Sequence, residues 1–215
     1  MPRESAVFCE VRQRAVHDFN INIRTMREGV SVQKGEKKGQ EYAVMELKEL
    51  TEKTLSLFGV DNPEQLGDAL MSACGDAEKL TAFKDLVGGD LAKDWMQMIY
   101  QYYLADRDAK KQDYTPPTIA DFMGMLAGHS DRIVDMCAGS GALIIQKWNR
   151  NKDIRFTAIE FDENVIPFLI FNMVLRNIRC RVFHMDALKD EPPMHSWDVM
   201  KGEEYGYITD IKSAL

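Results

Sequence analysis

Three acidic residues follow three β-prone runs in the second half of the sequence, and a glycine-rich turn follows the first run. Asp135 leads into the turn M-C-A-G-S-G at 136–141, Glu160 lies nineteen residues after Gly141, and Asp186 follows the third run. Carboxylates accept hydrogen bonds from hydroxyl and amino groups, and glycines let a backbone approach a ligand closely. At the carboxyl ends of neighbouring parallel strands, such acids face one crevice. The spacing therefore predicts a nucleoside-binding site in which Glu160 faces ribose hydroxyls.

Each of these features also has a simpler explanation. A glycine-rich turn between a strand and a helix can be a plain tight turn, and a single acid can be a helix N-cap or a surface carboxylate. Three acids at consecutive strand ends favour a shared site over coincidence. The turn has Ile144 where G-x-G-x-x-G requires its third glycine, which makes a nicotinamide dinucleotide the weaker option.

The elements that would position these residues follow from the apolar pattern. Strands are predicted at 132–135, 156–160 and 180–184, and helices at 42–58, 61–75, 91–104, 142–148 and 165–177. Strands that alternate with helices at this spacing are typical of βαβ units and a parallel sheet. An apolar stripe on the 91–104 helix predicts core packing and comprises Leu91, Trp95, Met98, Ile99 and Tyr102.

The predicted fold class is α/β, with an incomplete Rossmann-like sheet preceded by a helical N-terminal region. We divide the chain into an unassigned segment 1–41, a helical region 42–112 and a partial Rossmann-like domain 113–215. The first segment contains eight Lys or Arg residues against six acids, while the whole chain has a net charge of −7. That local excess could contact DNA or be a solvated basic face, so any DNA binding by the chain alone is expected to be weak.

Composition also limits the compartment and the class of site. The longest apolar stretch, 165–175, is too short to cross a bilayer, and the N-terminus lacks the apolar core of a signal peptide. The four cysteines are widely spaced and form no C-x-x-C pair, so neither a disulfide framework nor a metal site is indicated. We expect a cytoplasmic protein that does not associate with membranes.

Four ordered motifs resemble those of the adenine-N6 DNA methyltransferases, especially the modification subunits of type I restriction-modification systems. They are Y-T-P-P-T-I-A-D-F-M at 114–123, D-M-C-A-G-S-G at 135–141, I-E-F-D at 159–162 and M-D-A-L at 185–188. The similarity extends loosely back to Asp94. The resemblance implies a methyltransferase fold, S-adenosylmethionine as cofactor and DNA as substrate.

The resemblance also implies roles for individual residues. It places Thr115 and Pro116 beside the methionine part of the cofactor, Glu160 at the ribose and Asp186 at the adenine amino group. Phe161 would stack on the adenine ring or belong to the core. Asp135, Gly139 and Gly141 would form the floor of the site, and the expected cofactor-binding set also includes Tyr114, Cys137, Ser140 and Ala187. Cys137 is expected to pack behind the turn rather than to act as a nucleophile.

The catalytic motif of the family, N-P-P-Y or D-P-P-Y after the fourth strand, has no clear counterpart. The segment 197–202 reads as the strand that leads to it, but Glu203-Glu204-Tyr205-Gly206 follows. The paired prolines occur earlier, in D-E-P-P-M at 190–194. The weak catalytic candidates are therefore Glu203, Tyr205 and Asp190, and the catalytic residues stay open. His184 and His195 are expected to be structural or surface histidines.

Three functions are compatible with this pattern. The first is an adenine-N6 DNA methyltransferase of a restriction-modification system, catalytically impaired alone because N-P-P-Y is missing. The second is a non-catalytic cofactor-binding or assembly module that completes a split methyltransferase with a protein partner. The third is a methyltransferase that acts on RNA, protein or a small molecule, because a cofactor crevice does not specify its acceptor.

Overall fold

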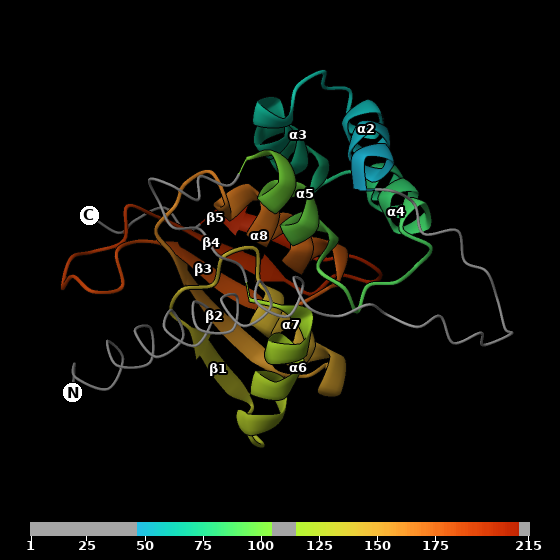
Figure 1. Ribbon diagram of the computed structural model, residues 1–215. Helices are drawn as coiled ribbons and strands as arrows, with labels where there is room; N and C mark the ends of the chain where they lie inside the picture. The colour runs from blue at the N-terminus through green and yellow to red at the C-terminus, as the bar shows by residue number, and fades with distance from the viewer. Residues whose placement is uncertain (1–46, 105–114, 211–215) are drawn as a thin grey trace, which may run out of the picture.

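The computed structural model describes residues 47–104 and 115–210 of the chain. A layer of helices precedes an α/β unit (Figure 1). The helices are α2 (Leu47–Phe58), the 3₁₀ helix η1 (Pro63–Gln65), α3 (Leu66–Ala73), α4 (Ala77–Leu86), α5 (Trp95–Tyr103), α6 (Pro117–Leu126), α7 (Ala142–Arg150) and α8 (Ile166–Leu175). The strands are β1 (Arg132–Asp135), β2 (Arg155–Glu160), β3 (Cys180–His184), β4 (His195–Met200) and β5 (Tyr207–Asp210).

The five strands form one mixed sheet in the order β1-β2-β3-β4-β5. Strands β1, β2 and β3 are parallel, with Asp135 opposite Ala158 and Glu160 opposite His184. The predicted alternation of strands and helices over 132–184 is therefore confirmed. Since successive right-handed crossovers run in the same direction across the sheet, α7 and α8 lie on the same face of it.

Strands β4 and β5 run antiparallel to their neighbours, with His195 opposite His184 and Trp197 opposite Val182. The sequence predicts a strand here, but not its direction. A parallel crossover needs a dozen or more residues, whereas the link between β3 and β4 is the ten residues 185–194. The short link is long enough only for a hairpin, so the end of β4 lies away from the carboxyl ends of β1 to β3.

Helix α8 joins the sheet to the helical layer. Nine of its ten residues are buried, and it contacts α3 and α5 on one side and β3 and β4 on the other (Figure 1). The Phe171 ring of α8 makes edge contacts with Phe58 and Phe83, each at a centroid distance of 5.5 Å. A helix buried on nearly all sides needs such apolar partners, which explains its apolar sequence, interrupted only by Asn172.

The hydrophobic core is continuous across the predicted boundary between residues 112 and 113. Leu66 and Phe83 of the helical layer belong to the same buried cluster as Phe168, Leu169 and Val182. The helical layer therefore packs as part of the α/β unit, and the division at this boundary stays a sequence-based prediction.

Some local expectations need correction. Helices α4 and α6 and strand β5 were not predicted from the sequence. The predicted stripe of α5 is partly wrong: the helix buries Met96, Ile99 and Tyr100, whereas Met98 is 40% exposed. The helix also begins at Trp95, after its N-cap Asp94, rather than at Leu91. Among the described residues, no helix is long and apolar enough to cross a membrane.

Candidate functional site

The glycine turn connects β1 to α7 and adopts backbone angles that favour glycine. Gly139 has a φ of 55° and Gly141, the N-cap of α7, a φ of 97°. A Cβ atom on Gly141 would lie 2.8 Å from the Met173 Cε and 3.0 Å from the Leu169 Cδ1. A side chain at 141 would therefore have to adopt this left-handed conformation and also displace the ends of the Met173 and Leu169 side chains. The turn ends at the N-terminus of α7, where free backbone N–H groups favour electron-rich ligand atoms.

Glu160, the last residue of β2, holds this turn. Its Oε2 accepts a hydrogen bond from the Gly139 N–H at 2.7 Å, while its Oε1 accepts from the Phe161 and Asp162 N–H groups at 2.8 and 2.9 Å. Burial raises the pKa of Glu160, against the effect of these three hydrogen bonds, which favour the charged carboxylate. A carboxylate offers about four lone-pair positions. One position on Oε2 is thus left for a hydroxyl group of a ligand.

The other two predicted acids lie at the same end of the sheet. Asp135 is buried at the end of β1 and accepts from the Cys137 N–H at 3.3 Å. Asp186 follows β3, accepts from the Leu188 N–H at 3.0 Å and lies 3.8 Å from the Lys189 ammonium group. The Met185 N–H donates to the Glu160 carbonyl at 3.0 Å, which ties the ends of β2 and β3 together. The structure therefore brings Asp135, Glu160 and Asp186 to one edge of the sheet.

The remaining predicted cofactor residues fall in different surroundings. Phe161 is 61% exposed beside Glu160, so its alternative assignment to the core is wrong. Ala187 is half-buried next to Asp186. Thr115 is buried and Pro116 is the N-cap of α6, whereas Tyr114 lies outside the described residues.

The Ser140 side chain points into the protein rather than toward the acids. Its hydroxyl donates to the Asp94 Oδ2 at 2.7 Å, and its carbonyl accepts from the Asn172 Nδ2 at 2.8 Å. The same Asn172 amide donates to the Asp94 Oδ1 at 2.8 Å, and its Oδ1 accepts from Arg176 at 2.7 Å. Any contact of Ser140 with a ligand would therefore involve its backbone.

Asp94, Asn172 and Arg176 were not predicted as site residues. All three are buried, and burial raises the pKa of Asp94 and lowers that of Arg176 to about 10. Arg176 also donates to the Leu91 carbonyl at 2.9 Å and to the Lys93 carbonyl at 2.6 Å, so the buried charge is well solvated by protein dipoles. The available sequence signal was two polar residues, Asn172 and Arg176, within the otherwise apolar segment 165–177, whereas Asp94 stands among other polar residues in 91–104.

The weak catalytic candidates lie at opposite ends of the sheet. Asp190 is exposed in the β3–β4 hairpin, at the same edge as Asp186. Glu203 and Tyr205 follow β4 at the other edge, where the Tyr205 hydroxyl lies 3.0 Å from the Thr81 hydroxyl of α4. The structure thus brings Asp190 to the end of the sheet that contains Asp135, Glu160 and Asp186, and does not bring Glu203 or Tyr205 there.

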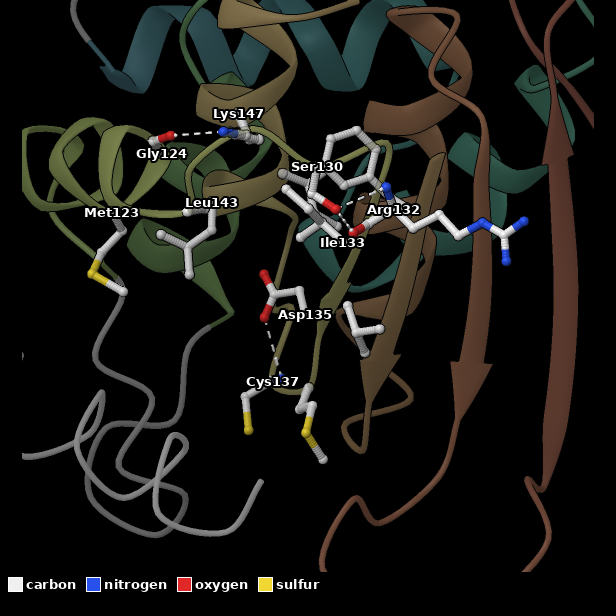
Figure 2. A pocket seen from close by; sticks show the side chains of 14 residues that line it. Met123, Gly124, Ser130, Arg132, Ile133, Asp135, Cys137, Leu143 and Lys147 are labelled. Atoms are coloured by element: carbon white, nitrogen blue, oxygen red, sulfur yellow. Dashed lines mark hydrogen bonds between the residues drawn. The ribbon is translucent and has the colours of Figure 1, made fainter. Parts of the chain in front are cut away.

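A cavity of about 370 Å³ adjoins the site along the outer side of β1. Figure 2 shows Asp135 on its wall, between Leu143 and Cys137. The walls also include Met123, Ile133 and Phe156, which are apolar. The buried Lys147 donates to the Gly124 carbonyl at 3.2 Å and to the Gly128 carbonyl, which fixes α7 against α6.

The cysteines differ from the expectation in one respect. Cys137 is disulfide-bonded, although the spacing of the cysteines indicated no disulfide. Cys74 and Cys180 are buried free thiols, and burial raises the pKa of both, that of Cys74 to about 12. Within the described parts of the chain, no group of three His, Cys, Asp or Glu side chains could hold a metal ion.

A glycine turn, a helix N-terminus and acids at the carboxyl ends of parallel strands define an α/β protein of the nucleotide- or nucleoside-binding class. A family model described as N-6 DNA Methylase matches residues 91–202, which is more than half of the chain. The chain belongs to the N-6 DNA methylase family. That match begins at Leu91, so it includes α5.

Comparison with solved structures and curated proteins adds little to this assignment. A crystal structure from Listeria monocytogenes, described as a candidate class I S-adenosylmethionine-dependent methyltransferase, is 13% identical with a TM-score of 0.45. The match covers 67% of this chain and 55% of that chain, so this chain spans about half the length of that protein. No curated protein matches the sequence.

Proposed function

We propose that the chain binds S-adenosylmethionine at the carboxyl ends of β1, β2 and β3 and serves adenine-N6 methylation of DNA in a restriction-modification system. One observation carries the proposal: Asp135 and Glu160 end β1 and β2, Asp186 follows β3, and all three lie at the end of the sheet where the glycine turn starts α7. Membership of the N-6 DNA methylase family makes this cofactor the expected ligand of that edge.

The residues at this edge fit the cofactor chemically. Glu160 retains one acceptor position for a ribose hydroxyl, and Asp186 can accept from an adenine amino group. Phe161 is exposed beside them and offers a ring face for stacking. Thr115 and Pro116, which precede α6, are assigned to the methionine part. When bound, the cofactor supplies the methyl group to be transferred.

The catalytic motif of the family, N-P-P-Y or D-P-P-Y, does not occur in this sequence. An exocyclic adenine amine is a weak nucleophile, so the base must be extruded, hydrogen-bonded and clamped by an aromatic ring. The hairpin at the cofactor edge offers Asp190 as an acceptor, but Met194, 56% exposed, stands where the family motif has an aromatic residue. We therefore expect the isolated chain to bind the cofactor and to transfer no methyl group.

A second candidate function is that of a module in a split methyltransferase. The lateral side of β1 that faces away from β2 favours this function. Within the described residues β1 pairs with β2 alone, Val134 is 59% exposed, and the apolar cavity borders the strand. The unpaired side of an edge strand presents backbone N–H and C=O groups with which another strand can pair. A protein partner that adds strands beside β1 would cover this edge and could supply the missing aromatic residue.

Calorimetric titration with S-adenosylmethionine, and with NAD as the competing dinucleotide, tests the cofactor assignment. Binding of the first with little or no binding of the second is the expected result, and preference for NAD would remove the assignment. A tritiated methyl-transfer assay on mixed DNA then tests the acceptor. Because the basic excess is confined to residues 1–41, DNA binding should be weak and its salt dependence shallow.

The same assay distinguishes the catalytic candidates if methyl transfer is observed, alone or with a partner. Loss of transfer in Asp190→Ala with full transfer in Glu203→Ala would assign catalysis to the D-E-P-P-M hairpin, as their positions on the sheet predict. The reverse result would show that the segment after β4 reaches the acceptor and would contradict the placement.

A further inference from the structure

Helix α5 presents polar side chains to three separate segments around the proposed cofactor site, at the carboxyl ends of β1 to β3. Its N-cap Asp94 accepts from the Ser140 hydroxyl in the glycine turn at 2.7 Å. Gln97 donates from Nε2 to the Thr115 carbonyl, before α6, at 3.2 Å. The Tyr100 hydroxyl donates to the Asp162 Oδ2, after β2, at 3.5 Å. The three segments are remote from one another in sequence, and α5 contacts all of them.

The three side chains share one face of the helix. They are spaced three residues apart, the separation that aligns side chains along a helix. Asp94, Gln97 and Tyr100 are 9%, 8% and 1% exposed, so all three side chains are buried. This face also packs against α8, because the Tyr100 ring contacts Phe168 at a centroid distance of 4.9 Å. The helix therefore occupies a fixed position behind the site.

The glycine turn is held from both sides as a result. Glu160 binds the Gly139 N–H on the side of the acids, while Asp94 and Asn172 bind the hydroxyl and carbonyl of Ser140 on the side of α5. Glycines make a turn conformationally permissive, so such a turn needs external contacts to hold one geometry. A ligand that binds a preformed site does not have to supply the free energy for ordering it.

We propose that Asp94, Gln97 and Tyr100 are positioning residues, through which α5 holds the glycine turn, the Thr-Pro segment and the segment after Glu160 in their ligand-binding arrangement. The inference rests on the proposed function only for the identity of the ligand. The relative importance of the contacts follows their geometry and charge. The charge-assisted bond of Asp94 is the shortest and should matter most, and the long bond of Tyr100 should matter least.

The first test compares two helix caps. Asp76, the N-cap of α4, accepts from the Glu78 and Lys79 N–H groups and contacts none of the three segments. Asp94→Ala and Asp76→Ala each remove an N-cap, so both should lower thermal stability. Asp94→Ala alone should weaken S-adenosylmethionine binding, by about tenfold or more, and Asp94→Asn should restore most of it because an amide can cap and bond Ser140.

The milder variants keep the inference testable if Asp94→Ala does not fold. Tyr100→Phe retains the buried ring and removes the hydroxyl, and Gln97→Met retains the chain length and removes the donor. We expect a loss of cofactor affinity of roughly fivefold for Gln97→Met and twofold for Tyr100→Phe. Wild-type affinity in all of these variants, with normal binding by the wild type, would overturn the inference.

Hydrogen exchange of the ligand-free protein separates this inference from the proposed function. In the α5 variants, amide exchange should rise in peptides that contain Gly139 to Gly141, Thr115 and Asp162, with no such rise in Asp76→Ala. This result would support the positioning role even if the wild type binds no S-adenosylmethionine, which would contradict the proposed function alone. Unchanged exchange in these three peptides would overturn the positioning role whatever ligand binds.

Discussion

A glutamate followed by an aromatic residue occurs at both ends of the sheet, but one glutamate is partly buried and the other is exposed. At the carboxyl ends of the parallel strands, Glu160 precedes Phe161, accepts three backbone hydrogen bonds and has a pKa raised by burial. At the other end, Glu204 precedes Tyr205 and pairs on the surface with Lys84 at 3.1 Å, and that hydrogen bond lowers its pKa. An acid followed by an aromatic residue is therefore not a site by itself.

The two glutamates also differ in the segments that they contact. Glu160 fixes the backbone of a glycine turn and of the segment that follows β2, so it holds two segments of the cofactor edge. Glu204 and Tyr205 contact Lys84 and Thr81 of α4, which attaches the link between β4 and β5 to the helical layer. The first pair shapes a potential ligand site, whereas the second stabilises a surface turn.

Replacement of the turn glycine should have the largest effect. Gly141→Ala places a Cβ on Met173 and Leu169 and forces a left-handed conformation on alanine, so the free energy of unfolding should fall by roughly 2–5 kcal/mol. Gly128, before β1, also has a positive φ, but a Cβ there meets nothing within 4 Å, so Gly128→Ala should cost about 1–2 kcal/mol. Urea unfolding of both variants measures the difference, and equal losses would contradict it.

The second prediction compares the two acids directly. Glu160→Ala should weaken S-adenosylmethionine binding by about 1–3 kcal/mol, because it removes a ligand acceptor and releases the Gly139 N–H. Glu204→Ala should leave the affinity unchanged, since its side chain lies at the other end of the sheet. Calorimetry on the two variants decides the point. Equal binding by wild type and Glu160→Ala would refute the assignment of Glu160.

The third prediction concerns pH. Because the pKa of Glu160 is raised in the folded state, the folded protein takes up its proton more readily than the unfolded chain does. Relative to Glu160→Gln, the stability of the wild type should be greatest below the ordinary carboxyl pKa and fall as pH rises through the raised pKa. The pKa of Glu204 is lowered, so relative to Glu204→Gln the wild type should lose stability as pH falls. Unfolding curves measured between about pH 3 and pH 8 should therefore give difference slopes of opposite sign.

The smallest effect is expected at the surface pair. Lys84 lies over the Tyr205 ring at 5.9 Å and bonds Glu204, but the two charged side chains are 36% and 62% exposed. Exposed ion pairs contribute little and are screened by salt. Lys84→Ala should change neither the cofactor affinity nor the exchange of the Gly139 peptide. A marked change in either would show that the two ends of the sheet are coupled.

The sequence predicted the order of elements from β1 to β3 and the acids at or just after the ends of these strands. These features depend on local information: apolar runs, the glycine turn and the alternation of strands with helices. The parallel pairing of the three strands was correct because the links between them contain helices and are long enough for crossovers. That pairing is sufficient to gather Asp135, Glu160 and Asp186.

The tertiary structure alone decided the direction of β4, and with it the location of Asp190, Glu203 and Tyr205. A β-prone run has no intrinsic direction, because either direction satisfies its backbone hydrogen bonds, and the short hairpin link made it antiparallel. Packing likewise decided that Ser140 faces inward to Asp94, a residue 46 positions earlier in the chain. Such a contact has no local pattern, since it exists only when α5, α8 and the glycine turn pack together and their buried polar groups must find partners.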